Sequence, residues 1–263
     1  MSGKIEELMR QRPEAEFAVE FSPRNLAEFH ERGFTTLERI TTEPELQWLR
    51  EVYDQLFVER AQLFPGAHVD LIQPAGGADG DLQAQILLPE IRFPELRKTA
   101  FWRNGQALAS ALLEIDLPDV RGWGHMIRKP PLDGCELPLP WHQDEAYWDR
   151  SFKYQALACW MPLDPATPES GCMSYIPGSH RSGVREHQRA GDGYARHVVG
   201  VEGVDSSLAI AAPVAAGGAV FHHCRTLHSS GPNRSERVRR AYANEWQLEP
   251  VKKRDTERAK LSA

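Results

Sequence analysis

Two side chains that can bind a metal ion lie close together in the segment Pro140-Trp141-His142-Gln143-Asp144. If this segment is a strand, residues i and i+2 point to the same face, so His142 and Asp144 can approach one ion while Gln143 points away. An imidazole and a carboxylate together suit borderline divalent metals. An HxD triplet also occurs by chance, and a structural histidine paired with a carboxylate is the more common explanation of that pattern alone.

A third ligand is available in the segment 217–242, GGAVFHHCRTLHSSGPNRSERVRRAY, if a strand ends at His228. Two histidines and one carboxylate on one face of an ion leave three positions open, as in non-haem Fe(II) oxygenases. Arg239 lies eleven residues after His228, beyond a turn. If the chain doubles back there as an antiparallel hairpin, the guanidinium reaches the same cavity. A dicarboxylate is then a natural partner, since arginine binds a carboxylate through two parallel hydrogen bonds.

Composition narrows the classes of protein that the chain can be. It has 263 residues, 41% of them hydrophobic, which is enough for a packed core and excludes wholesale disorder. The net charge of −6 favours neither nucleic acid nor an anionic membrane as a partner. The four cysteines form no CxxC pair, and the first residues have no apolar signal region. We therefore expect a cytoplasmic protein with reduced thiols and a small-molecule substrate; its oligomeric state stays open.

The first half of the chain is predicted to be mainly helical. Thr42 is a plausible N-cap, with Glu45 three residues later completing a capping box. An apolar stripe then continues the helix to about residue 61. Residues 1–22 are polar and without a clear period, which indicates a flexible lead-in. The other predicted elements are a helix over 24–32 that ends near Gly33, a strand over 34–40, a loop over 66–81 and a helix over 94–115.

After Pro118 the pattern changes to short strands separated by Gly/Pro turns, which is typical of an all-β sandwich or barrel. The predicted fold class is α+β, mainly β: a jelly roll, or double-stranded β-helix of the cupin type, with N-terminal helices packed on it. Residues 23–250 are expected to form this one domain, and 251–263 a polar tail. The strands are predicted at 120–128, 155–163, 172–176, 197–201, 207–214, 218–223 and 238–248.

Three motifs occur in the order and spacing of a known family: HQD at 142–144, WMPLDPATPESGCMSYIPGSH at 160–180 and HSSGPNRSERVRRA at 228–241. Together they resemble the phytanoyl-CoA dioxygenase family, over about residues 25–248. The resemblance implies a double-stranded β-helix with Fe(II) and with 2-oxoglutarate and O₂ as co-substrates, releasing succinate and CO₂. It also implies that His142, Asp144 and His228 are the iron ligands.

The resemblance assigns the 2-oxoglutarate pocket as well. Arg239 matches the arginine that binds the distal carboxylate, and Ser230 a hydroxyl that contacts the same group. Trp160 matches a tryptophan that lines the pocket. His125 matches a pocket position that is often methionine in the family, so its role can be toward the co-substrate or the substrate. Gln85 lies roughly where another co-substrate contact sits.

Other residues near these motifs have competing interpretations. We expect packing or a supporting role for His222 and His223 rather than metal ligation. Tyr147 and Trp148 follow Asp144 at the predicted mouth of the barrel, where they either pack in the core or touch substrate. The polar segment 181–196 is predicted to be either a lid or an exposed loop.

The predicted activity is hydroxylation of an unactivated C–H bond in a small-molecule metabolite. Because Asp144 is present, hydroxylation is favoured over halogenation, in which a small residue leaves room for chloride. Three alternatives stay open: a metal enzyme on the same barrel that needs no 2-oxoglutarate, a non-catalytic binding protein, and an oxygenase with a different oxidative outcome such as desaturation or epimerisation.

Overall fold

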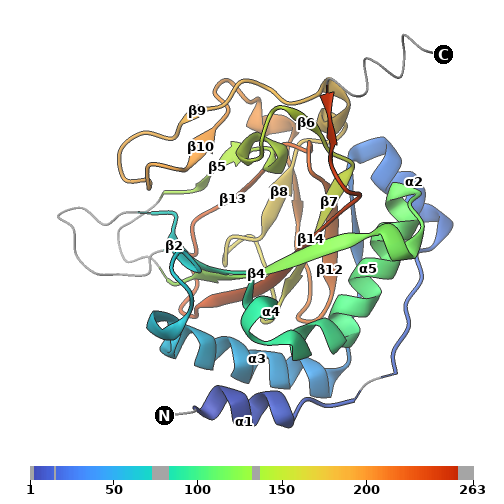
Figure 1. Ribbon diagram of the computed structural model, residues 1–263. Coiled ribbons are helices and arrows are strands. Elements are labelled where there is room, and N and C mark those ends of the chain that lie inside the picture. Colours follow the sequence, from blue (N-terminus) through green and yellow to red (C-terminus); the bar gives the residue numbers. More distant parts are fainter. Residues whose placement is uncertain (1–2, 15, 73–82, 132–136, 254–263) are drawn as a thin grey trace.

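Two antiparallel sheets face each other in this protein, whose computed structural model describes residues 3–14, 16–72, 83–131 and 137–253 (Figure 1). The major sheet has seven strands in the order β1-β12-β7-β14-β4-β3-β2, and the minor sheet four in the order β11-β8-β13-β5. This is the predicted jelly roll. The strands of the major sheet are β1 (Phe34–Leu37), β2 (His68–Asp70), β3 (Ala84–Leu87), β4 (Arg121–Lys129), β7 (Ala156–Pro162), β12 (Ala219–His223) and β14 (Arg239–Gln247). Those of the minor sheet are β5 (Leu139–His142), β8 (Met173–Tyr175), β11 (Ile210–Ala212) and β13 (His228–Ser230).

Helices from the first half of the chain cover the outer face of the major sheet, as Figure 1 shows for α3 and α5. One apolar cluster fills the space between these helices and the sheet, and a second lies between the two sheets. Among the described residues, no helix is both long and apolar enough to cross a bilayer. The helices are α1 (Lys4–Arg10), α2 (Pro23–Arg32), α3 (Glu43–Val58), α4 (Pro89–Arg92) and α5 (Ala100–Leu113), and the 3-10 helices are η1 (Arg60–Gln62), η2 (Pro94–Lys98), η3 (Leu117–Asp119), η4 (Asp144–Tyr147), η5 (Ser179–Ser182) and η6 (Ser206–Leu208).

Secondary structure is present within both the expected lead-in and the expected tail. Residues 4–10 form helix α1, which buries Ile5, Leu8 and Met9 against the helical layer. Its three apolar positions are too few to stand out from a polar segment. At the other end, β15 (Val251–Lys252) pairs with β6 (Phe152–Lys153). The rest of the tail, 254–263, lies outside the described residues, as does 73–82 of the predicted loop.

The predicted capping box at α3 was wrong in its second half. The Thr42 hydroxyl accepts from the Glu45 backbone N–H, as expected for an N-cap. The Glu45 carboxylate, however, turns to a different helix and accepts from the backbone N–H groups of Ala100 and Phe101 at 2.7 and 2.9 Å. A carboxylate stabilises a helix N-terminus because the first N–H groups there have no partner within the helix. Glu45 therefore joins α3 to α5, which begins at Ala100 and not at residue 94.

The strand predictions located most of the β-structure but not how it pairs. The runs at 120–128, 155–163, 218–223 and 238–248 correspond to β4, β7, β12 and β14 within two residues at either end. Five of the shorter elements, β2, β3, β6, β9 (Gln188–Arg189) and β15, were not predicted, because two- to four-residue strands leave little periodicity. β9 pairs with β10 (Val199–Gly200) in a separate two-stranded sheet.

Candidate active site

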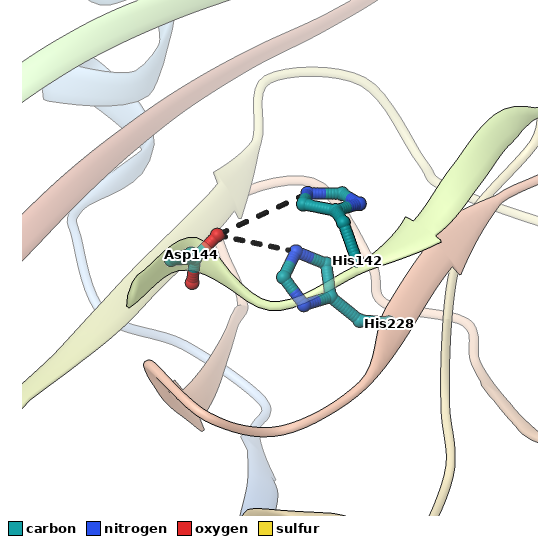
Figure 2. Close-up of side chains that lie close together, drawn as sticks. All are labelled: His142, Asp144 and His228. Atoms are coloured by element: carbon teal, nitrogen blue, oxygen red, sulfur yellow. Dashed lines mark ion pairs between the residues drawn. The ribbon is translucent and has the colours of Figure 1, made fainter. Parts of the chain in front are cut away.

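Two paired strands of the minor sheet hold the three predicted metal ligands. His228 begins β13 and lies directly opposite His142, the last residue of β5. The strand ends there, so Asp144 opens η4 rather than continuing β5 as expected. Figure 2 shows both imidazole rings facing the Asp144 carboxylate. The Asp144 Oδ1 atom lies 3.9 Å from His142 Nε2 and 3.4 Å from His228 Nε2.

The two histidines are held in the tautomer that a metal requires. The Nδ1 atoms of His142 and His228 lie 2.8 and 2.9 Å from the backbone carbonyls of Pro140 and Thr226. Because a carbonyl oxygen only accepts, each Nδ1 must carry the proton and donate it. Burial lowers the pKa of both rings, which keeps them neutral. Each Nε2 lone pair is therefore directed toward the ligand atoms of the other two residues, which lie within 4.8 Å of one another.

A third histidine holds the Asp144 carboxylate from the opposite sheet. The Asp144 Oδ2 atom accepts from His222 Nε2 at 3.1 Å, and His222 Nδ1 lies 3.2 Å from the Tyr175 hydroxyl. Burial alone raises the pKa of Asp144, but the surrounding histidines, His228 first, hold it below its ordinary value. The carboxylate is therefore ionised with one oxygen facing the two ligand histidines. His222 has the supporting role that the sequence suggested.

Every site residue predicted from the sequence lines one cavity of about 380 Å³. This volume lies within the usual range for small-molecule sites. Among its lining residues, Ser230 and Met173 come from the minor sheet, and Trp148 and Leu139 flank the metal ligands. The predicted residues on the cavity wall are His125, His142, Asp144, Trp160, His228, Ser230 and Arg239, together with Gln85, Tyr147 and Trp148.

Arg239 is a buried cation in this cavity without an acidic partner in the described part of the chain. Its guanidinium lies 5.2 Å from the Trp160 ring centroid and donates from Nη1 to the Gly171 carbonyl. Burial lowers the pKa of Arg239 to about 10, so the group stays charged at neutral pH. Its Nε and the Trp160 Nε1 are both buried with no hydrogen-bond partner. Two unused donors beside a buried positive charge fit a carboxylate of a bound co-substrate.

Arg239 reaches the cavity by a different path from the predicted hairpin. β13 pairs with β5 and β8 in the minor sheet, whereas β14 pairs with β4 and β7 in the major sheet. The turn after Ser230 therefore carries the chain from one sheet to the other, so Ser230 and Arg239 line the same cavity from different sheets. The hairpin was wrong because spacing along the chain does not distinguish a return within one sheet from a crossing between two.

Lys129 is a polar residue of this region that the sequence analysis did not assign. It is fully buried at the end of β4, directly opposite Arg239 on β14. Its Nζ donates to the Ser230 hydroxyl at 2.7 Å and to the Gly231 carbonyl at 2.5 Å. Burial, and then the charge of Arg239, lower the pKa of Lys129 well below its ordinary value. The alternation of Trp123, His125 and Ile127 before it in the strand could have shown that Lys129 points inward.

Gln143 points away from the metal ligands, as predicted, and holds the segment 181–196. Its amide donates to the Gly183 and Arg225 carbonyls at 2.8 and 2.6 Å, and it accepts from the Arg185 backbone N–H at 2.7 Å. Further along, the Tyr194 hydroxyl donates to the Pro138 carbonyl. The segment is thus anchored at both of its ends beside the ligand strand.

Comparison with known proteins agrees with this geometry. A family model described as "Phytanoyl-CoA dioxygenase (PhyH)" matches residues 29–241. The chain resembles the crystal structure of EvdO2 from Micromonospora carbonacea var. aurantiaca complexed with 2-oxoglutarate, with 39% identity, a TM-score of 0.77 and coverage of 90% of this chain and 95% of that one. Phytanoyl-CoA dioxygenase domain-containing protein 1 from Bos taurus is 26% identical, over 84% of this chain and 88% of its own. A probable alpha-ketoglutarate-dependent hypophosphite dioxygenase from Stutzerimonas stutzeri is 24% identical, over 84% and 79%.

The site and the comparisons lead to one conclusion. Two neutral imidazoles and an ionised carboxylate form the ligand set of a non-haem iron centre. The cavity beside them offers an arginine to an anionic co-substrate, and a 39% identical relative has 2-oxoglutarate bound. This chain is an iron- and 2-oxoglutarate-dependent oxygenase, and it belongs to the phytanoyl-CoA dioxygenase family.

Proposed function

We propose that this enzyme hydroxylates an unactivated C–H bond of a small-molecule metabolite and releases succinate and CO₂. The observation that carries the proposal is the presence, in one cavity, of an open two-histidine, one-carboxylate centre and of the cation Arg239, which has no acidic partner in the described part of the chain. A carboxylate ligand supports hydroxylation over halogenation, because Asp144 takes the position that a halide would need.

The co-substrate site is assigned to residues on both sheets. Arg239 and Ser230 would bind the distal carboxylate of 2-oxoglutarate, Arg239 through its guanidinium and Ser230 through a hydroxyl that Lys129 positions. Trp160 would line the pocket under the guanidinium and offer its Nε1–H. His125 also lines the cavity, and burial lowers its pKa to about 4, so it is a neutral ring suited to a hydrogen bond rather than to an ion pair.

The chain's own contribution to the reaction is placement. When bound, iron would supply the chemistry that breaks the C–H bond, with O₂ as the oxidant and 2-oxoglutarate as the donor of two electrons. His142 and His228 hold the metal at fixed Nε2 positions, and His222 orients Asp144. Tyr147 and Trp148, which are on the cavity wall after η4 begins, would hold the substrate over the metal and exclude water.

An anaerobic titration of the metal-free protein with Fe(II) and then 2-oxoglutarate tests this proposal. The chelate has a visible charge-transfer band, which we expect in wild type and not in His228→Ala. Arg239→Ala should need far more 2-oxoglutarate to develop the band. Arg240→Ala is the matched control, because Arg240 is the next residue on β14 but pairs on the outside with Asp164 and Asp54.

Each result of the titration has a definite meaning. A band in wild type and Arg240→Ala that weakens in Arg239→Ala supports the assigned pocket. No band in folded, iron-loaded wild type would contradict the use of 2-oxoglutarate and favour a metal enzyme that does not need it. Iron-dependent formation of succinate without any hydroxylated product from candidate substrates would point to another oxidative outcome.

The same proposal places the enzyme in the cytoplasm, with no nucleic acid or membrane as a partner. Support comes from the net charge of −6 and from Cys159, Cys172 and Cys224, which are buried and unpaired. Fractionation of the native host with an antibody to the chain would test the location. Recovery of the protein with membranes or with nucleic acid would contradict it.

A further inference from the structure

Glu245 is a buried carboxyl group on the cavity wall whose purpose the iron and 2-oxoglutarate sites do not explain. Its residue is 7% exposed, and its Oε2 atom is buried with no hydrogen-bond partner. Among the described cavity residues, Arg239 is the only lysine or arginine. Arg239 is the first residue of β14 and Glu245 the seventh, about 20 Å along the strand. Glu245 therefore has no counter-ion on the cavity wall.

The register of the major sheet places Glu245 in the same row of residues as the histidine that holds Asp144. Glu245 lies opposite Ala158 on β7, and Ala158 lies opposite His222 on β12. Two strand spacings, about 10 Å, therefore separate Glu245 from the histidine that holds Asp144. The Glu245 carboxyl is not among the ligand atoms that His142, Asp144 and His228 bring within 4.8 Å of one another. It lines the same cavity, so it is available to a substrate bound there.

Aromatic side chains surround the same part of the cavity. Trp123 lies opposite Glu245 on β4, and its ring meets the Trp148 ring at a centroid distance of 6.0 Å and an angle of 70°. Tyr147, 44% exposed, lines the cavity beside them and marks its opening to solvent. Flat aromatic faces next to one polar group are suited to a ligand with an apolar body and a polar substituent.

We propose that Glu245 binds a hydroxyl group of the primary substrate, whose carbon skeleton packs on Trp123 and Trp148. The inference rests on the proposed function, since it takes the reacting carbon to be held over the metal centre. A buried carboxyl without a partner is costly, and a substrate that supplies the hydrogen bond removes that cost.

A hydroxyl group fits this carboxyl better than an ammonium group does. Glu245 is buried and no lysine or arginine lies beside it on the described cavity wall, so burial raises its pKa well above the ordinary value and favours the neutral acid. A neutral carboxyl donates one hydrogen bond and accepts another, and so does an alcohol. An ammonium group only donates, and it would require the ionised form of Glu245 in a buried position.

Binding of three small cyclic probes to the full-length protein tests the proposal. The first probe, cis-1,2-cyclohexanediol, offers two hydroxyl groups. The second, cyclohexylamine, offers an ammonium group, and the third, cyclohexanone, offers a carbonyl that only accepts a hydrogen bond. Quenching of tryptophan fluorescence, to which Trp123 and Trp148 should respond, is measured without metal and again with Fe(II) and 2-oxoglutarate under anaerobic conditions. The proteins are wild type, Glu245→Gln and Glu245→Met, each checked for folding by its thermal transition.

We expect the diol to bind wild type roughly tenfold more tightly than either other probe, as one or two neutral hydrogen bonds allow. Glu245→Gln keeps a donor and an acceptor, so it should retain most of this preference, and Glu245→Met should lose it. A preference for the amine, lost equally in both variants, would overturn the hydroxyl assignment in favour of a cationic substrate. No preference in wild type, or one unchanged in Glu245→Met, would overturn the role of Glu245. Because binding is also measured without metal, these results do not depend on whether the charge-transfer band forms.

Discussion

Strand β14 carries a buried cation at one end of the cavity and a buried carboxyl at the other. Arg239 faces Lys129 across the β4–β14 pair, and no carboxylate in the described part of the chain pairs with either. Glu245, six residues further along, has no cation beside it. Each end thus lacks a partner that a bound molecule could supply. Arg239 lacks an anion, and Glu245 lacks a group that forms hydrogen bonds with its carboxyl.

Under the proposed function, the two ends of the cavity bind different molecules. The cationic end would bind 2-oxoglutarate, which is the same in every enzyme that uses it, so its residues belong to a motif that sequence comparison detects. The carboxyl end would face the substrate, which differs between enzymes. A residue there can only be interpreted from its burial, its partners and its place in the sheet.

Replacing Arg239 with alanine should have the largest effect of the variants that separate the two ends. Loss of a buried charge that pairs with a carboxylate should weaken 2-oxoglutarate binding by at least about a hundredfold. Binding is measured from the charge-transfer band in the presence of Fe(II), with Arg240→Ala as the control. Binding of the diol probe to the metal-free protein should not change. A parallel loss of diol binding would mean that the two ends are not independent.

His222→Phe should come next, because it removes the support of one metal ligand and keeps the volume of the side chain. Loss of the bond from Nε2 to Asp144 should lower Fe(II) affinity about 10- to 100-fold. His222→Gln, which keeps a donor, should recover part of that loss. Fe(II) affinity is measured by anaerobic competition with a chelator. Equal affinities in all three proteins would show that Asp144 needs no such support.

Lys129→Met should weaken 2-oxoglutarate binding by roughly tenfold, a smaller loss than that of Arg239→Ala. The lysine acts through Ser230, whose hydroxyl accepts its 2.7 Å hydrogen bond, rather than by touching the cavity. Ser230→Ala alone and the double variant complete a mutant cycle. We expect the double variant to bind 2-oxoglutarate about as well as the single variant that binds it less tightly, since both substitutions act through the Ser230 hydroxyl. Fully additive losses would show that Lys129 contributes by its charge alone.

The sequence predicted the fold class and located most of the long strands, because their alternation and the Gly/Pro turns between them are local signals. It did not predict helix α1, whose three buried residues are too few to form a pattern. Nor did it predict that the Glu45 carboxylate would cap α5, since that contact joins residues 55 positions apart. The crossing between sheets before Arg239 was missed for the same reason: pairing is a property of the whole fold.

Within the site, residue type and spacing were enough to bring together His142, Asp144 and His228. The buried ionisable residues Lys129 and Glu245 carry no such signal. Each follows another polar residue in its strand, Arg128 before Lys129 and Asn244 before Glu245, and neither belongs to a metal-binding motif. The register sets Lys129 against Arg239 and places Glu245 in the row of His222, which shows that both side chains point toward the minor sheet.

The two ends of the cavity should also give opposite pH dependences of stability in the metal-free protein. The pKa of Glu245 is raised on folding, so the native state keeps its proton and the free energy of unfolding falls as pH rises above about 4.5. The pKa of Lys129 is lowered, so the unfolded state binds the extra proton and stability rises with pH toward 10.5. Each slope is at most about 1.4 kcal/mol per pH unit.

Urea unfolding between pH 5 and 9.5 separates these two contributions. Glu245→Gln should lose the fall in stability with rising pH, and Lys129→Met should lose the rise, while Glu51→Gln on the exposed side of α3 should follow wild type. This change in the pH dependence of stability is the smallest of the four predicted effects. In wild type, the fall in the free energy of unfolding due to Glu245 and the rise due to Lys129 offset each other over the pH range that they share. If both variants kept the wild-type profile, neither group would change its protonation on folding. The partners that Arg239 and Glu245 lack would then have to come from within the protein rather than from a bound molecule.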